Sequence, residues 1–597
     1  MKLTAAFNLL LAVVLQASSL VNAAAVASDP CTAIAGKLFV VPSQALTCLT
    51  SFPYNETIQA NVMSNAERVT DFYSFEPFYK DSPPPFQESS VQIREEFSRI
   101  RETKYVSDYA FNRDLYDISL SLNDGHTQWF PSCYITFQSL LPTPVTSLFK
   151  DGEYNIYVAP DAVELVSLLG EQFTSFYDNL GFDWKRLAGA KVVEVEDQSA
   201  YDYIDHLATT QVGNYLDHGV RVNSVYTSYR IAGSAWAQRF GIFAGRRFPD
   251  QDYLTMKVIP VGSEEAEKVK VPFFASYLGS PFTDKASFWE TNCAVKNTTN
   301  GVNYLAGSTP TGRVARRLKL QPIAKIKEDS TPASAVGLPP QYIPTIPPVA
   351  GSAGAIKSYI LPDNTTGVIY VSTFSPDNFF QFQSDIDAAV KEFTSKNVTK
   401  LIVDLHNNGG GYVCLGEFLF QYLGGKSVGY PGFESTIRAN ELSKKIVAQN
   451  IKLGLNASWT FFAPDNWGFL NDTLQPANYN YVDPSVPFSV NGVSDPTSQR
   501  FHDTCTSSFN VAIPDTPAFK PENIALIGNG NCASTCALFS TLMYEGLKTK
   551  VAVFGGRPGQ HIEYKGMAGN QVLDWPALDS EIKTAGLKDD SLAPPDL

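Results

Sequence analysis

The sequence predicts a multi-domain α/β protein, and three observations carry this prediction. The chain has 597 residues, 44% of them hydrophobic, which is enough for several domains that each have a core. From Ser358 onward, short apolar runs alternate with amphipathic helical stretches, a pattern typical of strand–helix units around a largely parallel sheet. Upstream of that part, short strand-like runs with one or two helices indicate a small α+β unit.

Residues 1–23 have the order of a signal peptide. Lys2 is followed by an apolar run over residues 5–15, and Val21-Asn22-Ala23 fits a cleavage site with small residues. The run is well short of the ~20 residues that span a bilayer, which disfavours a membrane anchor. We therefore expect the mature chain to start near Ala24 and to be secreted or to reside in the lumen of the secretory pathway.

Sequons and cysteines agree with export. Glycosylation of the six N-x-[ST] sequons would place these asparagines on the surface: Asn55, Asn297, Asn364, Asn397, Asn456 and Asn471. The eight cysteines can pair in an oxidising compartment: Cys31, Cys48, Cys133, Cys293, Cys414, Cys505, Cys532 and Cys536. Their spacing leaves the connectivity open, and the one pair we predict is the local pair Cys31–Cys48.

The charge balance disfavours several kinds of partner. The net charge is −14, and no run is rich in Lys or Arg. Nucleic acids and anionic membranes are therefore poor partners, because binding to both rests on basic residues. The chain has no H-E-x-x-H motif and no C-x₂-C pair, so it predicts no metal site, and no cofactor is implied.

Residues 24–148 are expected to be mainly helical. Residues 88–101 are charged and amphipathic, and apolar residues recur at helical spacing over 105–122. The turn signal Asn123-Asp124-Gly125 ends this helix, and His126 follows it directly. A side chain in that place can be presented at a site, although an ordinary loop histidine fits the pattern as well.

Residues 149–285 are expected to form the small α+β unit. Its predicted strands lie at 154–158, 190–195, 253–258 and 269–274, and its predicted helix at 200–207. Residues 286–357 are expected to connect this unit to the next. Their proline pairs are incompatible with helices and central strands, and an exposed linker and an ordered surface loop both fit.

Residues 358–597 are expected to form a core of alternating strands and helices. The predicted strands lie at 367–374, 400–404, 523–527 and 550–554, and the predicted helices at 378–395, 413–423 and 537–545. Sites in such folds lie at the carboxyl ends of the strands. Two glycine-rich turns and one serine fall there.

The first of these turns follows the 400–404 strand and reads D-L-H-N-N-G-G-G from Asp404 to Gly411. Glycines allow a substrate to come close to backbone N–H groups, which can donate hydrogen bonds to a developing oxyanion. The turn lacks the lysine and the glycine spacing of phosphate-binding loops. A tight strand-to-helix turn without a chemical role is the alternative.

The second turn reads N-G-N-C-A-S-T-C and places Ser534 near the start of a helix. Free N–H groups and the positive end of the helix dipole favour negative charge there, which suits a nucleophile. An N-cap serine is the alternative. Cys532 and Cys536 are rival nucleophiles, but in a secreted chain we expect them to be disulfide-bonded. A serine nucleophile needs a base near neutral pH, and His126 is a natural choice.

Taken together, these segments resemble the S41 serine peptidase family, which includes the tail-specific proteases. Residues 401–411 resemble the family pattern D-L-R-x-N-G-G-G, with His406 in place of the arginine. Cys532-Ala533-Ser534 resembles the turn that carries the nucleophile, and residues 553–559 match the glycine-rich strand end after it. Residues 124–127 are similar to a D-x-H-T segment near the family's N-terminus. The order of the segments is most similar to the secreted fungal branch, related to the chlamydial protease-like activity factor group.

The resemblance implies a fold and a site. It implies a helical N-terminal region at 24–148, a PDZ-like α+β module at 149–285 and a crotonase-like (ClpP/crotonase) core at 358–597. In the site that it implies, a serine nucleophile, a histidine base and an oxyanion hole of backbone N–H groups act together: Ser534, His126, and Gly410 or Gly411 with Thr535.

Two departures from the family pattern bear on this site. Tail-specific members carry a catalytic lysine where this chain has Gln560, which supports a histidine base. Members with a histidine base also use a glutamate well downstream of the serine. Because the chain ends at Leu597, we expect this supporting glutamate to be missing or replaced, and three carboxylates are possible substitutes: Glu563, Asp574 and Glu581.

Two functions remain open. The first is a secreted serine endopeptidase that forms an acyl-enzyme and acts on polypeptides, including the peptide precursors that the fungal resemblance implies. The second is a catalytically impaired homologue that binds peptide C-termini through the PDZ-like module, by strand addition and backbone contacts.

Overall fold

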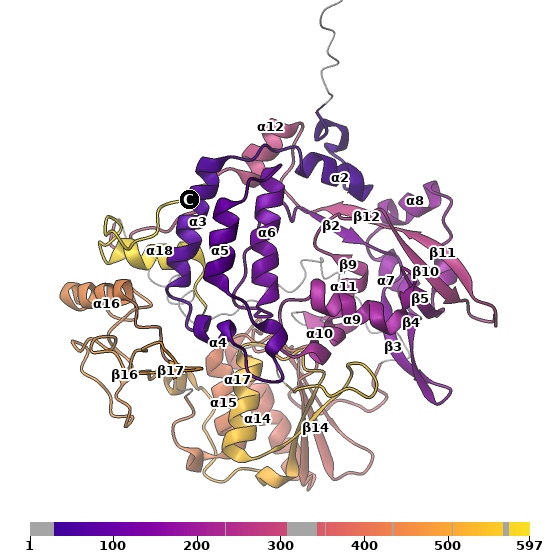
Figure 1. The fold of residues 1–597 in the computed structure, drawn as a ribbon. Coiled ribbons are helices and arrows are strands. Elements are labelled where there is room, and N and C mark those ends of the chain that lie inside the picture. Colours follow the sequence, from indigo (N-terminus) through magenta and orange to yellow (C-terminus); the bar gives the residue numbers. More distant parts are fainter. Residues whose placement is uncertain are drawn as a thin grey trace, which may run out of the picture.

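The computed structural model describes residues 29–232, 235–306, 343–352, 354–432, 435–503, 505–564 and 572–597 (Figure 1). The predicted signal peptide, residues 1–23, lies outside the described residues, and so do residues 307–342 of the predicted connection. The signal peptide and the character of that part of the connection therefore stay predictions.

The N-terminal part contains three long helices that lie side by side (Figure 1). They are α3 (Glu56–Thr70), α5 (Ile93–Glu102) and α6 (Asp108–Ser121). Asn55 caps α3 by accepting hydrogen bonds from the N–H groups of Thr57 and Ile58. Met63, Ile100 and Phe111 meet in one apolar cluster between them. The predicted helix over 105–122 is confirmed as α6.

The helix predicted over 88–101 begins later than expected. Glu88 lies in a short 3₁₀ turn, and α5 begins at Ile93. The physical reason is a tertiary contact, since the carboxylate of Glu88 pairs with the buried guanidinium of Arg221. Charge periodicity alone could not reveal that partner.

The predicted α+β unit is built on a sheet with the strand order β11-β10-β5-β4-β3. Its strands are β3 (Val145–Lys150), β4 (Glu153–Val158), β5 (Lys191–Val195), β10 (Tyr253–Ile259) and β11 (Glu267–Pro272). The helices α9 (Ala200–Thr210) and α10 (His218–Val225) belong to the same part of the chain. Alternate residues of β10 are buried, as expected for a strand with one face on a core. The four predicted strands and the predicted helix are confirmed.

A second sheet joins the N-terminal part to this unit. Its order is β1-β12-β2-β9, with β1 (Phe39–Val40), β2 (Phe137–Leu140), β9 (Gly245–Arg246) and β12 (Phe274–Tyr277). Strands from both sides of residue 148 alternate in it, and β3 itself crosses that position. The two parts therefore share structure at the boundary we predicted between them. Strands of two residues carry no periodicity that the sequence could have shown.

The C-terminal part contains a five-stranded sheet in the order β13-β14-β15-β20-β21. Its strands are β13 (Ile356–Ile360), β14 (Thr366–Val371), β15 (Lys400–Asp404), β20 (Ile524–Gly528) and β21 (Lys550–Val553). Only the β13–β14 pair is antiparallel. Its helices are α14 (Phe379–Ser395), α15 (Val413–Gly424) and α17 (Thr535–Thr541). The predicted alternation is confirmed, except that β13 begins inside the predicted connection.

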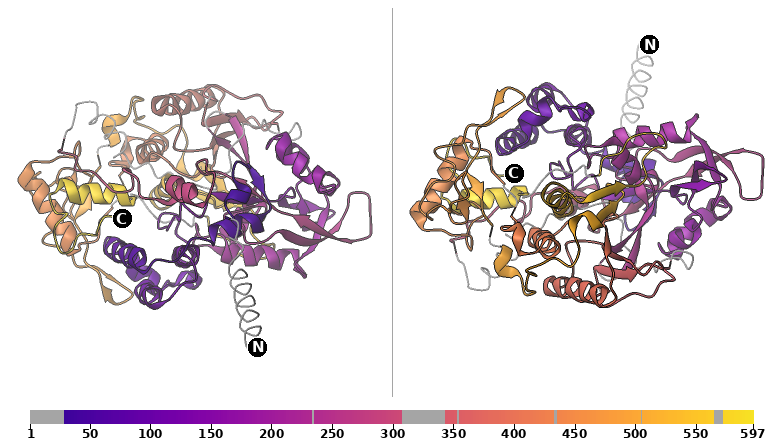
Figure 2. Two further views of the ribbon diagram at one scale, coloured as in Figure 1. Left: turned by 90° about the horizontal axis from the view of Figure 1, so that it is seen from above. Right: turned by 90° about the horizontal axis from the view of Figure 1, so that it is seen from below.

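A long insertion between α15 and β20 was not predicted. It contains α16 (Glu441–Leu453) and the short strands β16 (Trp467–Gly468) and β19 (Arg500–Phe501). Its apolar cluster includes Ile582 of α18 (Trp575–Thr584), so the last helix of the chain packs on it. Both views in Figure 2 show the yellow C-terminal helix against this orange segment.

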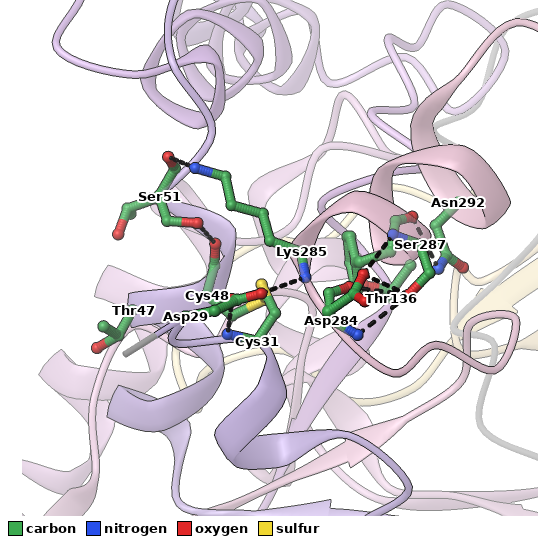
Figure 3. Close-up of a disulfide and its surroundings, with 12 residues drawn as sticks. Asp29, Cys31, Thr47, Cys48, Ser51, Thr136, Asp284, Lys285, Ser287 and Asn292 are labelled. Atoms are coloured by element: carbon green, nitrogen blue, oxygen red, sulfur yellow. Dashed lines mark hydrogen bonds between the residues drawn. A yellow bond between two sulfur atoms is a disulfide. The ribbon is translucent and has the colours of Figure 1, made fainter. Parts of the chain in front are cut away.

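All eight cysteines are disulfide-bonded. The pairs are Cys31–Cys48, Cys133–Cys293, Cys414–Cys505 and Cys532–Cys536, so the predicted local pair is confirmed. Figure 3 shows the Cys31–Cys48 bond beside Asp29, whose carboxylate accepts the backbone N–H of Lys285 at 2.7 Å.

Two further findings concern the surface. The six sequon asparagines are all exposed, which is where glycosylation needs them. Among the described residues, none of the helices combines the length and the apolar character that crossing a membrane requires.

Candidate active site

The two glycine-rich turns run alongside each other at the carboxyl ends of β15 and β20. The backbone N–H of Ala533 donates to the carbonyl of Asn408 at 3.0 Å. The hydroxyl of Thr535 donates to the carbonyl of Gly411 at 2.8 Å. These contacts bring together two segments that are more than a hundred residues apart in the sequence.

Ser534 has an unusual backbone conformation. It caps α17 with φ 51° and ψ −119°, a region that residues with a side chain rarely adopt. Holding a residue there costs on the order of 1–3 kcal/mol, and such residues cluster at active sites. The side chain is 1% exposed, and its hydroxyl has no hydrogen-bond partner among the described residues. A structural N-cap serine would use this hydroxyl to accept a backbone N–H, and Ser534 does not.

Gly410 lies directly against Ser534. A Cβ atom on Gly410 would lie 2.5 Å from the carbonyl oxygen of Ala533 and 2.8 Å from the Cβ atom of Ser534. A Cβ atom on Gly411 would lie 2.1 Å from the carbonyl carbon of Phe374. Both glycines also have positive φ, 87° and 144°. Only glycine fits these two positions, so the turn is built for close approach of backbone to Ser534.

The N–H groups at this site differ in their availability. Gly410 donates its N–H to the side-chain oxygen of Asn408 at 2.9 Å. Within the described parts of the chain, neither the N–H of Gly411 nor that of Thr535 has an acceptor. Of the predicted oxyanion donors, Gly411 and Thr535 are therefore free to bind an anionic oxygen, and Gly410 is already engaged.

His126 follows α6 in the tight turn that the sequence predicts. Its backbone N–H donates to Oδ1 of the buried Asp124 at 2.9 Å. The other oxygen of Asp124 accepts from the hydroxyls of Thr127 at 2.8 Å and Tyr73 at 3.0 Å. Both ring nitrogens of His126 are buried and lack a partner among the described residues.

The surroundings of His126 favour its neutral form. Burial lowers the pKa of the imidazole below its usual value, and the negative charge of Asp124 offsets part of this shift. A neutral imidazole can accept a proton, which is what a general base must do. Asp124 is a residue whose electrostatic role the sequence analysis missed. Its place two residues before the histidine was the available signal.

One chamber joins the elements that carry the two side chains. It has a volume of ≈ 3490 Å³, and its wall includes His126 together with Ala537, Leu538 and Thr541 of α17. Ser534 immediately precedes α17. The histidine and the serine helix thus face the same space, but Ser534 and His126 are not hydrogen-bonded to each other in this structure.

The three candidate supporting carboxylates have different surroundings. Glu581 is buried and accepts hydrogen bonds from Thr460 and from the N–H of Phe461, so it stabilises the insertion. Asp574 caps α18. Glu563 lines the chamber that His126 also lines, and its carboxylate contacts His561 at 2.9 Å. Glu563 and Asp574 both line the chamber that the proposed base lines, and Glu581 does not.

The ring of His406 contacts a carboxylate and an aromatic ring close to it. Its Nδ1 atom contacts Oδ1 of Asp404 at 2.6 Å, and its ring stacks on Phe554. In the described part of the chain, one further group of ligand-type atoms, Glu417, Asp503 and Cys505, lies within 4.8 Å. Cys505 is disulfide-bonded, so it cannot bind a metal as a thiolate.

A network of amide side chains beside the site was not predicted. Asn407 donates to the hydroxyl of Ser228 and to the carbonyl of Tyr229, both at 2.8 Å, and it accepts from Asn529 at 2.8 Å. Ser224 of α10 donates to Asn531 at 2.9 Å. The α+β unit is thus hydrogen-bonded to both glycine-rich turns.

Comparisons with known proteins place one segment of the chain in a family. Residues 365–432 match the model of peptidase family S41, a span that holds the first glycine turn. The Peptidase S41 family protein phomP1' of Diaporthe leptostromiformis is 25% identical over 552 residues, which cover 85% of this chain and 74% of that protein. The Peptidase S41 family protein ustP of Aspergillus flavus is 28% identical over 273 residues, covering 38% of this chain and 53% of that protein.

Two solved structures are similar at low sequence identity. Mature CPAF is 14% identical with a TM-score of 0.43, covering 89% of this chain and 96% of that one. The photosystem II D1 C-terminal processing protease is 10% identical with a TM-score of 0.23, covering 82% and 80%.

Proposed function

We propose that this chain, which carries a peptidase S41 domain, is a secreted serine endopeptidase with Ser534 as nucleophile and His126 as general base. The observation that carries the proposal is the conformation of Ser534. A buried serine with positive φ, an unused hydroxyl and glycine backbone packed against it is costly to maintain, and a catalytic role accounts for all three features.

The proposed reaction is acyl transfer. The Ser534 oxygen attacks the carbonyl carbon of a peptide bond while His126 takes the hydroxyl proton. The N–H groups of Gly411 and Thr535 stabilise the oxyanion, and the leaving amine takes the proton from His126 as the acyl-enzyme forms. Water then attacks the ester carbonyl while His126 takes a proton from it. As the ester C–O bond breaks, His126 gives this proton to the Ser534 oxygen, which releases the carboxylic acid product and restores the free serine.

The burial of Ser534 supports an unfolded polypeptide as the substrate. The serine side chain is 1% exposed, so a peptide bond must reach into the site to meet its hydroxyl, which an extended flexible chain can do more readily than the surface of a folded domain. Peptide precursors, which are short and flexible, are the substrates that we propose, with the unit at 149–285 as a PDZ-like module and the core as crotonase-like.

Hydrolysis of an unfolded polypeptide tests the proposal. The wild-type protein should cleave it, and Ser534→Ala should lower kcat by more than about 10³-fold, because it removes the nucleophile. Ser384→Ala, on the exposed face of α14, is the matched control and should retain the wild-type rate. Equal turnover by wild type and Ser534→Ala would remove Ser534 from the mechanism.

A second candidate function is peptide binding without catalysis. It is favoured by one observation: no hydrogen bond joins Ser534 to His126, and none of the described carboxylates hydrogen-bonds to the His126 ring. Catalytic hydrogen bonds are often long before substrate binds, which is why we prefer the enzyme. If the protein only binds, wild type and Ser534→Ala will bind a peptide equally and neither will cleave it.

A further inference from the structure

We infer that the Cys532–Cys536 disulfide positions Ser534, by holding the serine turn closed in the conformation that the reaction needs. This inference rests on the proposed function and adds two positioning residues to it. Neither cysteine touches the reacting atoms in the mechanism. They act through the backbone of the turn between them.

The disulfide brackets the serine symmetrically. Ala533 alone separates Ser534 from Cys532, and Thr535 alone separates it from Cys536. The Cα atoms of the two cysteines are 5.1 Å apart. Four extended residue steps would span about 13 Å. The bond therefore prevents the ends of the turn from separating, whatever the residues between them would otherwise adopt.

Besides the disulfide, Ser534 is held by the packing of Gly410 and by backbone hydrogen bonds, and its own carbonyl accepts the N–H of Leu538 in α17 at 2.9 Å. On the serine's N-terminal side, Ala533 donates its N–H to Asn408, and on its C-terminal side the Thr535 hydroxyl donates to Gly411. Both acceptors lie on the glycine turn, and the Ser534 side chain adds no hydrogen bond. Within the turn, the Cys536 N–H donates to the carbonyl of Ala533 at 2.9 Å.

Relaxation of the turn would disturb two groups at once. A change of φ at Ser534 from its positive value rotates the direction of its Cβ–Oγ bond relative to the glycine turn. The same change moves the N–H of Thr535, which the proposed mechanism uses as an oxyanion donor. The Cys532–Cys536 disulfide therefore positions the nucleophile and the oxyanion hole together. Its loss should lower kcat more than it changes KM.

A purely stabilising role explains the bond less well. The stabilisation that a disulfide gives by restricting the unfolded chain grows with the length of the loop it closes. The sequence separation is 4 for this pair, against 17 for Cys31–Cys48 and 160 for Cys133–Cys293. The bond is also buried, which protects it from reductants and argues against a redox switch.

The test compares two double variants. Cys532→Ala/Cys536→Ala removes the disulfide around Ser534. Cys31→Ala/Cys48→Ala removes another short-range buried disulfide, which belongs to a different apolar cluster. The first should lower kcat roughly 10- to 100-fold with little change in KM. The second should leave kcat within about 2-fold of wild type, while lowering the melting temperature at least as much.

Hydrogen exchange gives a readout that does not need activity. Without the Cys532–Cys536 disulfide, the amides of residues 528–541 should exchange faster, and the exchange rates of the α3 amides should not change. If the protein proves inactive, the proposed function fails while this measurement still decides the inference. Should the alanine variant not fold, Cys532→Ser/Cys536→Ser is the substitute, because it preserves volume better. Unchanged exchange over 528–541, or loss of kcat in proportion to melting temperature in both double variants, would overturn the inference.

Discussion

His126 and Asp124 show how two residues set the proton affinity of the site. Burial of the imidazole disfavours its charged form, whereas the nearby carboxylate favours that form. The carboxylate contacts the backbone of His126 and two hydroxyls, and it makes no hydrogen bond to the ring. Asp124 therefore acts on the imidazole through its charge and through the shape of the turn.

The pH dependence of the rate follows from the lowered pKa of His126. The neutral imidazole is the active form, so kcat/KM should rise with pH through the pKa of His126, which lies below its ordinary value of ~6.5. Asp124→Asn removes the charge that raises this pKa, so the acid limb should move to lower pH. Asp117→Asn, on the exposed face of α6, is the control and should leave the limb in place. A shift of the limb to higher pH in Asp124→Asn would contradict this account.

At the scale of elements, the first glycine turn is an interface as well as a loop. Gly410 and Gly411 bring the chain that follows β15 against the turn that follows β20, and neither position tolerates a side chain. Gly409, the neighbour in sequence, differs in both respects: a Cβ atom there would meet no atom within 4 Å, and its φ is not positive. Gly409 is therefore a matched control position for substitutions at Gly410 and Gly411.

Gly410→Ala should lower kcat by at least about 100-fold, since the new methyl group must displace Ala533 or Ser534. The positive φ adds a cost of roughly 1 kcal/mol or more to stability. Gly409→Ala should keep both kcat and melting temperature close to wild type. Steady-state kinetics and thermal unfolding of the two variants measure this difference, and equal effects in both would mean that the close packing on Ser534 is not needed.

The elements also show what the sequence could predict. The strands β14, β15, β20 and β21 were predictable because apolar runs of four to six residues alternate with helices of clear periodicity. Short strands such as β1 and β9 were not, because two residues have no period. Within the site, residue types and order pointed to Ser534 and His126. The sequence could not show that the N–H of Gly410 already donates to the side chain of Asn408, because this hydrogen bond depends on the rotamer of Asn408.

At the scale of the whole molecule, the proposed site draws on three parts of the chain. His126 comes from the N-terminal part, Ser534 comes from the C-terminal core, and α10 of the α+β unit lies against the serine turn. Val220 of α10 packs on Ala533 in a small buried cluster. The geometry at Ser534 therefore depends on how firmly α10 is docked on the core.

Asn223 is the side chain that docks α10 most completely. It is buried, it donates to the carbonyls of Asn529 at 2.7 Å and Phe554 at 3.1 Å, and it accepts the N–H of Gly556 at 2.7 Å. These three backbone groups follow the ends of β20 and β21. An unsatisfied buried group costs about 1–3 kcal/mol, so loss of this one side chain affects both strand ends at once.

Asn223→Ala should therefore loosen the docking of α10 by about 2–3 kcal/mol, which corresponds to amide exchange in α10 that is roughly 30- to 150-fold faster. Exchange in α3, which belongs to another apolar cluster, should not change. Asn478→Ala, at an exposed position of the insertion, is the matched control and should leave both helices unaffected. If α10 exchanges at the wild-type rate in Asn223→Ala, the amide contacts do not hold the unit on the core, and its apolar contacts alone must do so.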